Sequence, residues 1–161
     1  MNTTIARALA VVRILIGIGF VWMGISMLMN HGFLYGGLLE HLTATGGPVR
    51  IYRDIFLRVV EPRETLVVYF ASTVSILLGL LYLTGTLISL TSLASSFLVV
   101  NYGLASSSWN RPRQLLFFLA TVLLLMLGRM GAGCTWGVDG WLIRRFKDWL
   151  VLFPLRRKAP M

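Results

Sequence analysis

The sequence predicts an all-α polytopic membrane protein, a four-transmembrane-helix bundle with two amphipathic interfacial helices. Hydrophobic residues make up 57% of the 161 residues and charged residues only 13%, whereas a soluble domain carries about 25% charged residues. No Asp, Glu, Lys or Arg occurs from Thr65 to Asn110, a run long enough for two helices of about 20 apolar residues each. This composition excludes an ordinary soluble enzyme, a disordered chain and a coiled coil, and predicts one membrane domain over residues 1–161.

The four predicted spans follow the distribution of charge along the chain. The first covers about residues 8–29 and contains one charged residue, Arg13. The second, at about 66–83, and the third, at about 86–104, share the uncharged run and are separated by a turn at Gly85. The fourth, at about 112–131, begins after Asn110, which can cap the helix, with Pro112 in its first turn.

Two further segments, at about 49–60 and 139–153, are expected to form helices that lie flat in the headgroup region. In each, apolar side chains fall on one helical stripe and charged, mostly basic ones lie opposite, the pattern of an interfacial helix. Asp139 is predicted to cap the second helix, and Pro62 and Pro154 to end the two helices. The stripes consist of Ile51, Tyr52, Ile55, Phe56, Val59 and Val60 in the first and Leu142, Phe146, Trp149, Leu150 and Phe153 in the second.

Small residues at helical spacing mark the faces on which the spans are expected to pack. Such residues let membrane helices approach closely, and helix packing is favoured over a ligand groove for all three sets. These are Gly17 with Gly24, then Ser72, Ser75 and Gly79, and finally Ser89, Ser92 and Ser96.

The formal net charge of +9 is unevenly distributed about the predicted spans. With four spans, both termini and the Gly85 turn lie on one face, which carries the larger excess of Lys and Arg. Basic flanks stay on the cytoplasmic side, so both termini are predicted to be cytoplasmic, in the cytoplasmic membrane of a bacterium or archaeon. Because the basic residues flank membrane segments, the expected partners are anionic lipids and other membrane-protein subunits, with no nucleic acid.

Arg13 and Asn101 are the polar residues inside the spans that invite a functional interpretation. Arg13 lies close enough to the start of its span to extend toward the headgroups; alternatively it contacts an anion, a quinone carbonyl or a partner subunit. No acidic residue lies within any predicted span, so a partner in this chain would be a carbonyl or a hydroxyl. Asn101 carries a carboxamide that is costly to leave unbonded in hydrocarbon, so we expect it to bond across to another helix.

Other chemistry is disfavoured by the residues present. His31 and His41 suggest a metal or haem site, but one lies at the end of the first span and the other in the following loop, so interfacial histidines are favoured and no metal is expected. The single Cys134 excludes an internal disulfide and a cysteine metal cluster. A proton-driven transporter is disfavoured because the spans contain no carboxylate.

Four short patterns occur in order along nearly the whole chain, and together they resemble the DoxX/DoxD family. This family of small four-span membrane proteins includes the membrane subunit of thiosulfate:quinone oxidoreductase. The patterns are Arg13 to Gly17 followed by Phe20 and Gly24; the segment Gly47 to Pro62; the pair Gly79 and Gly85; and the closing stretch Gly131 to Asp139.

Several charged positions of that family are missing from this chain. No Lys occurs in residues 25–29 after the first-span glycines, Ser75 stands where the family often has a Glu, and Cys134 stands at the closing Arg. Because ionisable groups are lost while the apolar framework remains, we expect an accessory or structural subunit of a larger redox or energy-converting membrane complex, not catalytic on its own. Bound lipids are also expected.

The resemblance implies an alternative, a quinone-binding membrane subunit of a thiosulfate:quinone-type oxidoreductase. In that interpretation quinone is the cofactor, and Arg13 and Asn101 are the candidate contacts to its carbonyls. A small transporter or lipid-modulating protein is the third interpretation.

Overall fold

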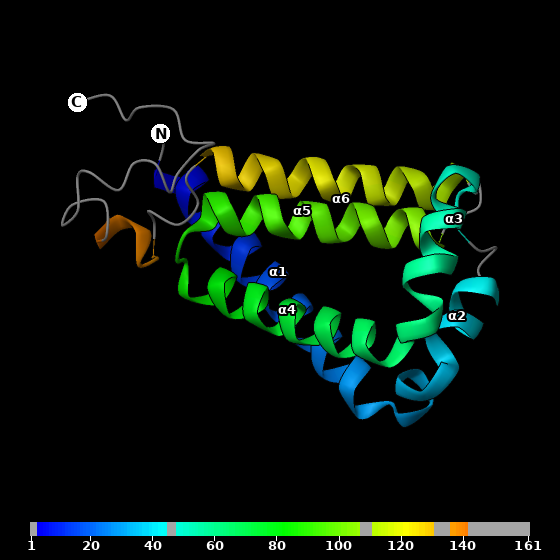
Figure 1. Cartoon of the computed structure of the whole chain (residues 1–161). Helices are drawn as coiled ribbons and strands as arrows, with labels where there is room; N and C mark the ends of the chain where they lie inside the picture. Colours follow the sequence, from blue (N-terminus) through cyan, green and yellow to red (C-terminus); the bar gives the residue numbers. More distant parts are fainter. Residues whose placement is uncertain (1–2, 45–47, 107–110, 131–135, 142–161) are drawn as a thin grey trace.

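The computed structural model describes residues 3–44, 48–106, 111–130 and 136–141, and every regular element in these ranges is a helix (Figure 1). Three apolar helices are long enough to cross a membrane: α1 (Thr3–Met29), α4 (Glu64–Thr84) and α5 (Ile88–Ser106). For the described residues, the prediction of an all-α fold with helices long and apolar enough to span a membrane is therefore confirmed. The apolar part of α6 (Arg111–Met130) is shorter, at Gln114–Met130, so the fourth crossing stays a prediction.

The predicted turn between the second and third spans lies where the sequence indicates. α4 ends at Gly85, which adopts the left-handed conformation (φ 68°, ψ 39°) and donates its N–H to the carbonyl of Leu81. Glycine reaches this conformation without a steric penalty and is the usual residue after a helix. Leu87 also has a positive φ, 51°, although it has a Cβ. The turn is therefore strained, and other contacts must hold it.

α1 and α4 pack against each other along their length because glycines line their interface. A Cβ built on Gly24 would lie 2.7 Å from the carbonyl oxygen of Ser72, and one built on Gly79 would lie 2.8 Å from that of Gly17. Such short distances require glycine at these positions. The predicted packing faces of these two helices are thus confirmed.

α5 and α6 form a second close pair. Gly103 lies against the ring of Phe117, and the Ser89 hydroxyl donates to the carbonyl of Gly128 at 3.2 Å. Tyr82, in the last turn of α4, joins the two pairs near the Gly85 end, and its hydroxyl bonds that of Ser95 at 2.7 Å. Tyr82 is fully buried.

The two helix pairs form a wedge. Figure 1 shows α4 beside α5 at the Gly85 turn and diverging from it toward the other end, where α3 crosses between them. α3 (Arg50–Val59) coincides with the first predicted interfacial helix. Its start is attached to the end of α5, since the Val49 N–H donates to the carbonyl of Leu104 at 2.9 Å. Of its apolar stripe, Phe56 is buried, whereas Ile55 and Val59 are exposed.

The connection from α1 to α3 is more ordered than the sequence suggests. A kinked π-helical turn (η1, Phe33–Gly37) leads into α2 (Leu38–Ala44). His41 therefore lies on a short helix, and the prediction that it lies in a loop was wrong. Leu38 and Leu42 of α2 pack with Phe56 in a core cluster under α3. A 3₁₀ turn (η2, Glu61–Arg63) then joins α3 to α4. Most of the predicted helix 139–153 lies outside the described residues.

Candidate functional site

Arg13 is fully buried in the structure, and its guanidinium reaches the Gly85 turn at the end of α4. Its guanidinium Nη2 donates to the backbone carbonyl of Trp136 at 3.0 Å, and Nη1 lies against Gly85, where a Cβ would overlap it. The carboxylate of Asp139 acts on the same guanidinium through its charge. The expectation that a carbonyl binds Arg13 is confirmed, but the segment after α6 also supplies an acidic neighbour.

Asp139 caps a helix different from the one predicted. Its two carboxylate oxygens accept the N–H groups of Leu87 at 2.6 Å and Ile88 at 3.0 Å, which begin α5. The backbone of the same segment is also bonded to the α4–α5 turn. The Val138 N–H donates to the carbonyl of Thr84, and the Asp139 N–H donates to the carbonyl of Gly85. A carboxylate at a helix N-terminus satisfies its unbonded N–H groups and complements its dipole.

These residues form one structural unit, which we call the turn latch: Arg13, Gly85, Trp136 and Asp139. It joins α1, the α4–α5 turn and the segment after α6. Arg13 and Asp139 are both at most 2% exposed, and a buried arginine beside a buried carboxylate is tolerated because each is bonded. Within the latch, Arg13 is bonded to the Trp136 carbonyl and lies close enough to the Asp139 carboxylate to be affected by its charge.

Asn101 lies far from this latch. Asn101 comes thirteen positions after Ile88 along α5, which is roughly 20 Å at the helical rise. The structure therefore does not bring together the two predicted quinone contacts. Asn101 Oδ1 instead accepts the hydroxyl of Tyr52 on α3 at 3.0 Å, and its Nδ2 donates to the carbonyl of Phe97 at 2.8 Å. The prediction that Asn101 bonds across to another helix is confirmed.

A cavity of about 450 Å³ lies where the two helix pairs diverge, and Asn101 and Tyr52 are on its wall. We call it the α4–α5 cavity. Ligand sites are concave, mostly apolar and within the range of about 300–1,000 Å³. The other side chains that line it are almost all apolar, including Met23, Met27, Phe33, Leu38, Leu42, Val67, Phe70, Val74, Phe97 and Leu98.

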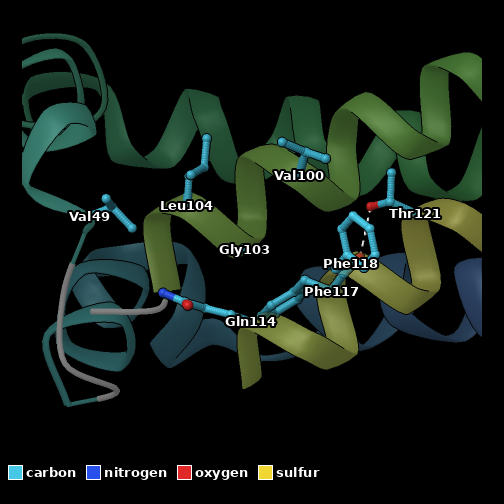
Figure 2. A pocket seen from close by; sticks show the side chains of 8 residues that line it. All are labelled: Val49, Val100, Gly103, Leu104, Gln114, Phe117, Phe118 and Thr121. Atoms are coloured by element: carbon cyan, nitrogen blue, oxygen red, sulfur yellow. Dashed lines mark hydrogen bonds between the residues drawn. The ribbon is translucent and has the colours of Figure 1, made fainter. Parts of the chain in front are cut away.

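Two further cavities are smaller and flank the α5–α6 pair. One of about 310 Å³ lies between α1, α5 and α6 and includes Gly19 and Ala120. The other, about 320 Å³, lies between α5 and α6 (Figure 2). Figure 2 shows the rings of Phe117 and Phe118 along it, with the Thr121 hydroxyl bonded to the carbonyl of Phe117 at 2.8 Å.

The two histidines do not form a common site with these cavities. His31 and His41 are exposed, and the His41 ring packs edge-on against Phe33 with centroids 5.9 Å apart. Within the described ranges, no group of three His, Cys, Asp or Glu side chains is arranged to hold a metal ion.

Sequence reasoning missed Tyr52 as a polar group, because it stands within an apolar stripe. The one available signal was a single hydroxyl among Ile, Phe and Val side chains. The role of Asp139 had no local signal, since its partners lie 51 and 52 residues earlier.

The chain matches no protein-family model, no curated protein and no solved structure. The resemblance to the DoxX/DoxD family therefore stays a prediction.

Proposed function

We propose that the chain is a four-span integral membrane protein whose role is structural, as an accessory subunit of a larger redox or energy-converting membrane complex. In this arrangement α6 is the fourth crossing, α3 lies in the interface and both termini face the cytoplasm. α6 supports the proposal because it pairs closely with α5, and side chains such as Leu116 and Phe118 are exposed along it. Exposed apolar side chains of this size suit contact with lipid or neighbouring helices.

The observation that carries the accessory role is the use of the buried polar groups in the described interior. The Arg13 and Asp139 side chains hold the Gly85 turn, and Tyr82 joins α4 to α5. These bonds fix helices to each other, so the groups best suited to chemistry are already occupied by the fold. Function would then come from the outer surface, through partners.

Purification from native membranes in a mild detergent tests this role. We expect other membrane-protein subunits to co-purify in constant stoichiometry, including subunits with redox cofactors. A protein that is purified alone and turns over a substrate by itself contradicts the proposal.

The α4–α5 cavity favours a second candidate, the quinone-binding subunit of a thiosulfate:quinone-type oxidoreductase. In this version the contact would be Asn101, on the cavity wall, whereas Arg13 is committed to the turn latch. The protein extracted from native membranes should then retain quinone, and Asn101→Leu should retain less of it while Arg13→Lys, if folded, retains it. Absence of quinone from the extracted protein contradicts this candidate.

A further inference from the structure

We propose that the α4–α5 cavity is an amphiphile-binding site that fills from the bilayer, through an opening between Phe70 and Phe97. The ligand is an apolar chain that carries a carbonyl at one end, and that carbonyl accepts a hydrogen bond from Asn101. This proposal rests on the four-span arrangement proposed above, because that arrangement makes the outer surface between α4 and α5 face lipid.

The opening is indicated by two side chains that belong both to the cavity wall and to the outer surface. Phe70 of α4 and Phe97 of α5 line the cavity, yet they are 71% and 73% exposed. Deeper wall residues on the same helices, such as Val68 and Ala105, are buried. The cavity therefore reaches the surface beside these two rings, about 9 Å along α4 from its start at Glu64.

The opposite wall closes the cavity toward the interface. Tyr52 of α3 donates its hydroxyl to Asn101, which fastens α3 across the wide end of the wedge. Phe56 of the same helix packs on Leu38, Leu42 and Val68. With this end covered, a ligand of the bilayer enters sideways between α4 and α5.

The polar group that would recognise the ligand is the carboxamide nitrogen of Asn101. Nδ2 carries two N–H groups, and one of them donates to the carbonyl of Phe97. The bond to Tyr52 is made by Oδ1 and does not use an N–H group. No described residue accepts the second N–H of Nδ2. An N–H group without a hydrogen-bond acceptor is costly in hydrocarbon. The cavity should therefore prefer a ligand that carries an acceptor over a plain hydrocarbon chain.

The position of Asn101 also fixes the orientation of the ligand. Asn101 lies five residues before the end of α5, about 8 Å from that end. The carbonyl then lies at the depth where lipid headgroups meet acyl chains, and the apolar chain extends toward the bilayer centre past Ser75 and Ala71. Both a fatty-acyl carbonyl and an isoprenoid-quinone carbonyl satisfy this geometry.

Photocrosslinking of the full chain in phospholipid vesicles tests the proposal. Two probes are used in separate arms, a stearic acid with a diazirine on its chain and an isoprenoid quinone with a diazirine on its tail. The proposal predicts that crosslinks from at least one arm concentrate on peptides that contain Phe70, Ala71 or Phe97. Crosslinks spread evenly over lipid-facing residues, including Leu116 and Leu119 of α6, would overturn it.

Two variants with a matched control decide whether the cavity is responsible. Ala71→Trp fills the cavity and should abolish the concentrated crosslinks, whereas Ala120→Trp places the same side chain in the cavity between α1 and α6 and should leave them. Asn101→Leu removes the donor and should weaken retention of the probe about three- to tenfold. Unchanged crosslinking by both Ala71→Trp and Asn101→Leu contradicts the site, whatever partners co-purify.

Comparison of the crosslinking yields of the acyl probe and the quinone probe identifies the source of the ligand. Crosslinking by the acyl probe alone assigns the site to bilayer lipid, and crosslinking by the quinone probe alone assigns it to quinone. The accessory role is judged separately, by co-purification of partners with Ala71→Trp, so loss of the ligand site and loss of the complex are distinguishable.

Discussion

At the scale of single residues, Gly85 has little freedom to change. Its left-handed conformation is strained for any residue with a Cβ, and Arg13 and Gly137 occupy the space that a Cβ would need. The same contact explains why Arg13 is buried. Its guanidinium lies over the turn and donates to the carbonyl of Trp136.

Gly85→Ala is therefore expected to destabilise the protein by about 1–2 kcal/mol from backbone strain alone, with a further loss because Arg13 must move. The measurement is unfolding of the purified protein in mixed micelles of mild detergent and SDS. Gly19→Ala is the control, because a Cβ there meets no atom within 4 Å and alanine favours a helix interior. Equal stability of the two variants would refute the role given to the turn.

At the scale of helices, the start of α5 depends on a residue that follows α6. The Leu87 and Ile88 N–H groups have Asp139 as their acceptor, and Leu87 holds a positive φ. The cap therefore couples α5 to the segment after α6 and, through Arg13, to α1. No local pattern at the start of α5 supplies such a cap.

Asp139→Ala should lower the free energy of unfolding by about 3–5 kcal/mol, because it leaves buried N–H groups and a buried guanidinium without their carboxylate. Asp139→Asn keeps one acceptor oxygen and should lose less. In a double-mutant cycle, Arg13→Met with Asp139→Ala should cost less than the sum of the two single changes, with a coupling of about 0.5–3 kcal/mol. Additive losses would show that Arg13 and Asp139 act independently.

At the scale of the whole molecule, the fold is two close helix pairs that diverge from a fastened end. The turn latch holds the narrow end, and α3, bonded through Val49 and Tyr52, covers the wide end. The α4–α5 cavity lies where the pairs are furthest apart. The architecture thus places a ligand-sized space between the two pairs, in addition to the smaller cavity between α5 and α6.

Much of this fold could be predicted from the sequence because hydrophobic length and small-residue spacing are local signals. The three long helices end within a few residues of the predicted bounds, and Gly85 forms the expected turn. α2 was missed because its seven residues form a helix only with Leu38 and Leu42 packed against Phe56. The α4–α5 cavity was also missed, since its wall comes from helices whose divergence no single segment encodes.

The candidate site was predicted in part. Asn101 stood out as a carboxamide in an apolar run, and it does bond another helix. Its pairing with Arg13 failed because the two residues lie near opposite ends of the spans. Arg13 is close to the start of the first predicted span, whereas Asn101 is close to the end of the third, which starts at the same face. Asp139 could not be connected to α5 by any spacing rule, because the contact joins distant parts of the chain.

The number of membrane crossings is the claim on which the rest of the account depends, and single-cysteine labelling in sealed vesicles of known orientation measures it most directly. Cys134 is first replaced by Ser, and Arg7→Cys, Glu61→Cys and Lys158→Cys are then labelled separately with a membrane-impermeant maleimide. Four crossings predict that Arg7→Cys and Lys158→Cys react from the cytoplasmic side and Glu61→Cys from the opposite side. Reaction of Arg7→Cys and Lys158→Cys from opposite sides would give an odd number of crossings and contradict the account.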